Sequence, residues 1–154
     1  CAVTAAGNMT VSPITPSIAN SYTLTITTTT TNDDNADTSD TMYTSIYTPD
    51  DVAILVDQEL YTGIEKSETK EKSLVIPGNY DEIKVLIYIS GTNGVVFSEI
   101  KISYDNIEYT FTTVDNTIND NEYGNDNTVG WFDSYSGDEA GPKYRYYTNI
   151  YTEA

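Results

Sequence analysis

The strongest constraint on the fold is a strict alternation of side chains between Ile83 and Phe111. In 83–89 the odd positions are Ile, Val, Ile and Ile, and the even positions are Lys, Leu and Tyr. The same period of two recurs in 99–104 and 107–112, and it is typical of strands with one face in a core. Asn93-Gly94 and Asp105-Asn106 separate the three segments and tolerate the positive φ angles of short hairpin turns. The pattern therefore predicts a three-stranded antiparallel meander.

The rest of the chain also favours strands over helices. Thr is abundant and there are 14 Tyr, and β-branched and aromatic side chains suit a pleated, half-buried surface. The apolar run 52–56 is consistent with a buried strand, and 63–72 is expected to be a solvated loop. Further strands are predicted at 21–31, 41–48, 73–76, 128–132 and 143–151, for a total of eight to ten. We therefore predict an all-β chain whose residues 21–154 form one antiparallel two-sheet β-sandwich, of jelly-roll or immunoglobulin-like type.

Residues 1–20 differ from this pattern and are predicted to form an extended N-terminal arm. Pro13 and Pro16 exclude a central strand here, because proline cannot donate to a ladder of backbone hydrogen bonds. The sizeable aliphatic side chains of the arm are Val11, Ile14 and Ile18. These three are the side chains that an arm of this kind would dock, on its own domain or on a neighbouring subunit.

The N-terminus predicts a location outside the cell. The chain begins with Cys1 and not with Met, which indicates that a leader has been removed. Three explanations of Cys1 compete: a lipidated mature terminus, an inter-subunit disulfide, or an accident of the cleavage position. Asn8 lies in an Asn-Met-Thr sequon, a glycan acceptor in secreted proteins. Since no stretch approaches 18 apolar residues, no membrane span is expected, and we predict an extracellular or cell-surface protein.

The charge of the chain bears on its partners. With 24 acidic and 7 basic residues, the net charge is −17, which makes nucleic acid an unsuitable partner because its affinity rests on Lys and Arg. Acidic loops are the kind of segment that binds Ca²⁺, which takes six to eight oxygen ligands. Flexible acidic loops without metal are the alternative. The candidate ligands fall into two groups, one at 32–40 and one at 115–127: Asp33, Asp34, Asp37 and Asp40, then Asp115, Asp120, Glu122 and Asp126.

Catalysis finds little support in the sequence. The chain has no His, which removes the commonest general base and every Ser-His or Cys-His arrangement. Paired carboxylates could serve glycoside hydrolysis, but no pair stands out by its spacing. We therefore expect no enzyme, with a glycoside-acting enzyme as the least favoured of three hypotheses.

Tyrosines near the C-terminus raise a second hypothesis, a carbohydrate-binding or adhesive module. Exposed aromatic rings can stack on the faces of sugars, whereas alternate tyrosines on a strand also serve core and edge packing. The candidate residues for sugar binding are Trp131, Tyr135, Tyr144, Tyr146 and Tyr147.

Assembly is the first hypothesis. An N-terminal arm on a Thr-rich β-sandwich could add as a strand to the sheet of the next subunit, and such a head-to-tail contact makes filaments or tubes. In the arm 1–20, the Thr-rich strand 21–31 and the Asp/Asn loops, the chain resembles subunits of extracellular prokaryotic filaments and tubes, including the archaeal cannula proteins. Because Cys1 has no place in the cannula pattern, a pilin-like lipoprotein or surface-anchored variant is the alternative. This resemblance implies jelly-roll domains joined by donor strands into a homopolymer, with calcium able to bridge subunits.

Overall fold

The structure is a computed structural model that describes residues 21–91, 93–115, 123–133 and 142–152. These residues form ten strands and no helix, so the all-β prediction is confirmed. In chain order the strands are β1 (Ser21–Thr30), β2 (Thr38–Tyr47), β3 (Ala53–Ile64), β4 (Thr69–Pro77), β5 (Glu82–Ile89), β6 (Val95–Tyr104), β7 (Ile107–Phe111), β8 (Val114–Asp115), β9 (Val129–Phe132) and β10 (Tyr144–Tyr151).

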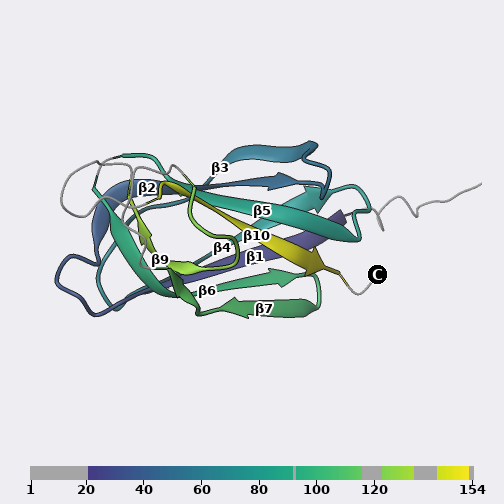
Figure 1. Cartoon of the computed structure of the whole chain (residues 1–154). Helices are drawn as coiled ribbons and strands as arrows, with labels where there is room; N and C mark the ends of the chain where they lie inside the picture. Colours follow the sequence, from purple (N-terminus) through teal and green to yellow (C-terminus); the bar gives the residue numbers. More distant parts are fainter. Residues whose placement is uncertain (1–20, 92, 116–122, 134–141, 153–154) are drawn as a thin grey trace, which may run out of the picture.

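The strands form two sheets that face each other (Figure 1). The larger sheet has the order β4-β1-β6-β9-β8, with β7 also paired to β6, and the smaller sheet has the order β10-β5-β2-β3. All strand pairs are antiparallel except β8 and β9, which run parallel. The predicted antiparallel two-sheet sandwich is therefore confirmed.

The core lies between the sheets and follows the alternation seen in the sequence. The odd positions of 83–89 are fully buried, as are Ile100, Ile102 and Tyr104 on β6. Leu24 and Ile26 on β1 and Met42 and Ile46 on β2 also belong to this buried cluster. Packing one apolar face of each sheet against the other is what makes a sandwich of such strands stable.

The predicted meander 83–111 is wrong in one respect. β6 and β7 do form a hairpin, and Asp105 at its turn has φ +57. β5, however, belongs to the smaller sheet, where it lies between β10 and β2, so 90–94 crosses from one sheet to the other. The alternation alone could not separate these arrangements, because both bury the same face of each strand.

Three local expectations are also corrected. The run 52–56 is not a buried strand. Val52, just before the edge strand β3, is 61% exposed, and Val56, on that strand, is 50% exposed. Most of 63–72 is not a loop, because β3 continues to Ile64 and β4 begins at Thr69. Residue Asp40 lies within β2 and not in a loop, because that strand begins at Thr38.

Residues 1–20 lie outside the described part of the chain. The structure therefore does not test the arm, its aliphatic residues Val11, Ile14 and Ile18, the sequon at Asn8, or the three explanations of Cys1. Within the described residues, no helix is long and apolar enough to cross a membrane.

Candidate functional site

Tyrosines line up across the outer face of the smaller sheet. The register places Tyr43 of β2 opposite Tyr88 of β5, and Tyr88 opposite Tyr144 of β10. Two residues further along, Leu86 of β5 lies between Ser45 of β2 and Tyr146 of β10. Because side chains two apart on a strand share a face, these rows lie side by side on the surface opposite to the core.

The rings form an almost continuous series of contacts. Tyr43 stacks on Tyr88 with ring centroids 5.5 Å apart, and Tyr88 lies 5.2 Å from Tyr144. Tyr123, from the segment before β9, stacks on both Tyr144 and Tyr146 at 4.9 and 5.8 Å. Tyr47 closes the series with an edge contact to Tyr146 at 6.4 Å. Six tyrosines from three strands and one connecting segment therefore act as a single aromatic surface.

A cleft of about 440 Å³ opens within this surface. Its central row carries Ser45 and Leu86, which are buried and shorter than the tyrosines beside them. The hollow therefore arises from the difference in side-chain length between neighbouring rows of one sheet. We call it the tyrosine cleft, and its lining residues are Ser45, Tyr47, Asp57, Leu86, Tyr88, Tyr123, Tyr144 and Tyr146.

Asp57 brings a carboxylate to the cleft through an irregularity in β3. Its backbone has φ +54, and the pairing of β2 with β3 shifts register on both sides of this region. The Asp57 N–H donates to Ser45 Oγ at 2.9 Å, and the Tyr88 hydroxyl donates to Asp57 Oδ1. β-Bulges often re-aim a side chain in this way, and here the side chain is exposed at the edge of an aromatic cleft.

The segment that carries Tyr123 is fastened to the edge of β10. The Gly124 N–H donates to the Tyr144 carbonyl at 2.8 Å, and the Asn127 N–H donates to the Tyr146 carbonyl at 2.9 Å. Asn127 also accepts from the Thr148 N–H at 2.8 Å. These bonds hold Tyr123 over the rings of β10, although half of its surface is exposed.

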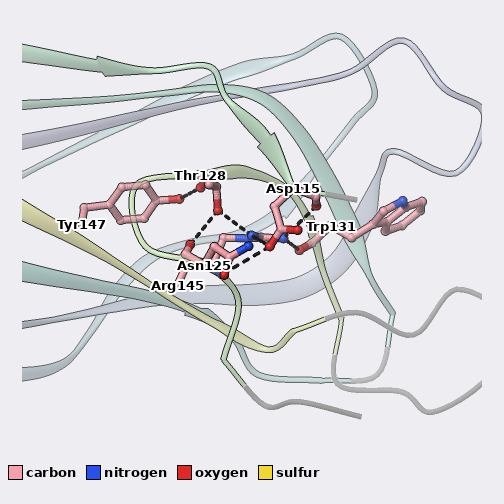
Figure 2. Close-up of polar contacts among 6 residues, drawn as sticks. All are labelled: Asp115, Asn125, Thr128, Trp131, Arg145 and Tyr147. Atoms are coloured by element: carbon pink, nitrogen blue, oxygen red, sulfur yellow. Dashed lines mark hydrogen bonds and ion pairs between the residues drawn. The ribbon is translucent and has the colours of Figure 1, made fainter. Parts of the chain in front are cut away.

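Beneath this segment lies a buried ion pair, drawn in Figure 2. Arg145 of β10 is fully buried, and its Nη1 lies 3.0 Å from Asp115 Oδ2 and donates to Thr128 Oγ1 at 2.7 Å. Its Nη2 donates to the Trp131 carbonyl at 2.7 Å, while the Trp131 indole points away from the cluster (Figure 2). Asp115 Oδ2 also accepts from the Asn125 N–H at 3.2 Å. One charged pair thus joins β8, β9, β10 and the Tyr123 segment.

Two glycines make room for this cluster. A Cβ on Gly124 would lie 2.6 Å from Arg145 Nη1, and a Cβ on Gly130 would lie 2.8 Å from the Asp115 carbonyl oxygen. Gly130 also has φ +124, a conformation that side-chain-bearing residues rarely adopt. Gly124 is therefore restricted by the Arg145 guanidinium, and Gly130 by its backbone conformation and the Asp115 backbone.

Two phenols of the cleft, Tyr88 and Tyr146, have a raised pKa. Burial raises the pKa of Tyr88, with further contributions from the Asp57 carboxylate. Burial is also the largest cause of the raised pKa of Tyr146. The neighbouring phenols Tyr123 and Tyr47 and the carboxylates Asp51 and Asp126 raise it further. Tyr146 keeps its hydroxyl proton and can donate a hydrogen bond to an oxygen-rich ligand, whereas Tyr88 already donates to Asp57. Both rings offer apolar faces.

Only part of the predicted set of sugar-binding residues lies at this cleft. Tyr144 and Tyr146 do, but Tyr147 points into the core, where it is fully buried and donates to the Thr128 carbonyl at 2.6 Å. The choice of Tyr147 was therefore wrong. Trp131 lines a separate polar cavity of about 330 Å³, and Tyr135 lies outside the described residues.

Sequence reasoning missed three tyrosines and the carboxylate of the cleft, and also Tyr43 on the aromatic surface beside it. Three of these tyrosines lie in predicted strands: Tyr43, Tyr47 and Tyr88. The alternation predicts which face of its strand each occupies, but whether they meet depends on which strands pair. Tyr123 and Asp57 have no such signal, because one lies in a connecting segment and the other in a bulge.

The aspartates of 32–40 have separate neighbours. Asp33 accepts from Thr31 Oγ1 at 3.1 Å, Asp34 lies 3.5 Å from Lys66 Nζ, and Asp40 accepts from the Asn93 N–H at 2.7 Å. Asp37 lines the polar cavity that also includes Trp131. Asp40 therefore fixes the crossing between the sheets, which is a structural task.

The second predicted group of ligands is likewise divided. Asp115 pairs with Arg145, and Asp126 is exposed in the segment that carries Tyr123. Asp120 and Glu122 fall outside the described residues. Where the structure describes the chain, it brings no three acidic side chains together in a group that could hold a metal ion. Calcium binding stays a prediction from the sequence.

Comparisons with known proteins give no family. No family model matches the chain, and no curated protein matches it. Among solved structures, a crystal structure of a LOX deletion variant aligns with a TM-score of 0.48 at 12% identity, over 60% of this chain and 14% of that one. The alpha toxin of Clostridium absonum aligns with a TM-score of 0.37 at 18% identity, over 59% of this chain and 30% of the toxin. The chain thus spans less than a third of either protein, and likenesses this weak carry no information about its activity.

Proposed function

We propose that this chain is a carbohydrate-binding module that acts outside the cell or at its surface and binds glycans in the tyrosine cleft. The observation that carries the proposal is the convergence of five tyrosines, from three strands and one connecting segment, on one hollow of about 440 Å³. The module is proposed to bind and not to catalyse, in keeping with a sequence that has no His.

The chemistry of the cleft suits a sugar. Pyranose rings present apolar C–H faces and a rim of hydroxyls, so they need flat apolar surfaces beside a few hydrogen-bonding groups. Here the rings of Tyr88, Tyr123, Tyr144 and Tyr146 supply the flat surfaces. The phenol hydroxyls, Asp57 and Ser45 supply hydrogen-bonding groups along the same walls.

The proposal is tested by removing one exposed ring. Tyr123→Ala deletes a side chain that is 50% exposed, so the fold should persist, as thermal unfolding can check. Aromatic residues at binding centres commonly dominate the affinity, so the variant should bind at least about tenfold more weakly than the unaltered chain. The measurement is a glycan array, followed by isothermal titration calorimetry with the best soluble oligosaccharide.

Tyr151→Ala is the matched control for this experiment. Tyr151 is also an exposed tyrosine, 44% accessible at the end of β10, but it does not line the cleft. This variant should bind like the unaltered chain. An array on which no glycan exceeds background, or equal losses in the two variants, would contradict the proposal.

Assembly by strand addition is the second candidate. Among the described strands, none pairs with the outer edge of β3 or of β4, and unpaired edges are the surfaces on which added strands bind. Apolar side chains are exposed on or beside both edges: Val52 and Val56 at β3, and Val75, 65% exposed, on β4. These edges could accept a strand from residues 1–20 of another copy and so build an extracellular homopolymer, with or without bridging calcium.

Electron microscopy of the purified chain tests this second candidate. Filaments or tubes are expected from the full chain and not from a variant that lacks residues 1–20. A further variant, Val75→Lys, places a charge on the edge of β4 and should shorten or abolish polymers if this is the accepting edge. Identical polymers from all three proteins would refute strand addition by the arm, and an added chelator would reveal any need for calcium.

A further inference from the structure

The tyrosine cleft has an electronegative character beyond what a neutral sugar needs. Asp57 is the one formally charged residue among the described residues that line it. Its carboxylate is exposed, and its position is fixed by the hydrogen bond from its N–H to Ser45 Oγ and by the Tyr88 hydroxyl. A carboxylate beside several aromatic rings is the arrangement that recognises organic cations, because the ring faces also carry partial negative charge.

The same surface already holds two ammonium groups of the protein itself. Lys84 Nζ lies 5.1 Å from the ring centroid of Tyr146, where it also contacts Asp51. Lys143 Nζ lies 5.4 Å from the ring centroid of Tyr144. Both distances are within the range of cation–π attraction. The ring faces of Tyr144 and Tyr146 thus accept ammonium groups at the rim of the cleft.

Two carboxylates further away, Asp51 and Asp126, act in the same direction, against the charges of Lys143 and of Lys84, which contacts Asp51. The carboxylates Asp51 and Asp126 contribute to the raised pKa of Tyr146, as Asp57 does for Tyr88, after the effect of burial. The chain as a whole carries a net charge of −17. A field of this sign concentrates cations near the surface and speeds their association.

We propose that the ligand of the tyrosine cleft is an oligosaccharide of amino sugars whose free amino groups are protonated. This assignment rests on the proposed carbohydrate binding. The sugar rings stack on the tyrosines, and one ammonium group of the ligand lies against Asp57. Among cationic partners, a sugar polymer suits this site better than a basic peptide, because its repeating flat rings match a row of aromatic faces.

The test compares two ligands with the same sugar backbone, one with free, protonated amino groups and one with neutral, acetylated amino groups. Isothermal titration calorimetry with glucosamine oligomers and with matched N-acetylglucosamine oligomers is done in a mildly acidic buffer that keeps the free amines protonated. The free amines should give at least about tenfold higher affinity, since one ammonium gains both a carboxylate and a ring face. Added salt should reduce the difference.

Asp57→Asn identifies the group responsible. Asn tolerates positive φ and can still accept from the Tyr88 hydroxyl, so the bulge should survive. The preference for free amines should fall to about threefold or less, because the free-amine oligomer loses more affinity than the N-acetylated one. Asp34→Asn is the control, since it removes the same charge from a side chain that is 97% exposed and does not line the cleft; it should keep the preference.

The possible outcomes distinguish the amino-sugar assignment from the carbohydrate binding on which it rests. Equal affinity for the two oligomers, or an unchanged preference in Asp57→Asn, overturns the amino-sugar assignment and leaves carbohydrate binding in place. Failure of every glycan to bind overturns both. An oligolysine peptide that binds as tightly as the amino sugar, and needs both Asp57 and Tyr123, would show that the cleft recognises cations and not sugars.

Discussion

Asp115→Ala is expected to lower the free energy of unfolding by about 3–5 kcal/mol, because it leaves the Arg145 guanidinium buried without its counter-charge. Arg145 is fully buried, and Asp115 Oδ2 lies 3.0 Å from its Nη1. The guanidinium also lies 5.2 Å from the ring centroid of Phe132, inside the core, where water cannot replace the carboxylate. The measurement is a pair of urea unfolding curves, one for Asp115→Ala and one for the unaltered chain. The midpoint should fall while the m-value stays the same.

Two further variants show whether charge is the cause. Asp126→Ala removes an exposed carboxylate from the neighbouring segment and should change stability by no more than about 0.5 kcal/mol. Asp115→Leu combined with Arg145→Met removes both charges and should be more stable than Asp115→Ala, since no buried charge remains unpaired. A loss below about 1 kcal/mol in Asp115→Ala would mean that the pair is not what holds these strands together.

The ion pair also connects stability to the proposed site. Asp115 accepts from the Asn125 N–H, two residues after Tyr123, so its loss loosens the segment that carries one wall of the cleft. The bonds from Gly124 and Asn127 to β10 remain. Asp115→Ala should therefore weaken glycan binding although residue 115 does not touch the cleft.

The sequence predicted the core better than the site, for a physical reason. Burial of one face imposes a period of two on each strand separately, so the inward residues of β5 and β6 could be read without knowing their partners. The tyrosine cleft depends on lateral register, because Tyr43, Tyr88 and Tyr144 meet only through the pairing of β2, β5 and β10. No local feature of the sequence encodes that pairing. A meander would instead place β5 beside β6, and not between β10 and β2.

Single residues were misjudged where their partners come from distant parts of the chain. Asp115 looks like one member of an acidic loop until Arg145, 30 residues later, is placed beside it. Tyr147 follows Tyr146 directly, and the two face opposite sides of the same strand. That alternation was available from the sequence and should have excluded Tyr147 from a surface site.

Alkaline pH is expected to unfold this protein steeply once it passes about 10, the ordinary pKa of tyrosine. Burial raises the pKa of Tyr61, Tyr88, Tyr104, Tyr146 and Tyr147 in the folded chain. When the pKa of a phenol is higher in the folded than in the unfolded chain, its contribution to stability is complete at pH values below the unfolded pKa. That contribution is lost as the pH rises through the folded pKa. The unfolded chain then releases protons that the folded chain retains, so the free energy of unfolding falls.

Tyr147→Phe isolates one of these groups. Tyr147 is fully buried, so its phenol should contribute about 1.4 kcal/mol of lost stability for each pH unit above 10. The variant loses the hydrogen bond to the Thr128 carbonyl, which costs about 1 kcal/mol at neutral pH. Its alkaline decline should nevertheless be shallower, so that the two stability curves converge as pH rises. Thermal unfolding across this pH range, followed with the phenolate absorbance band, measures both effects, and parallel curves would mean that Tyr147 ionises in the folded state without cost.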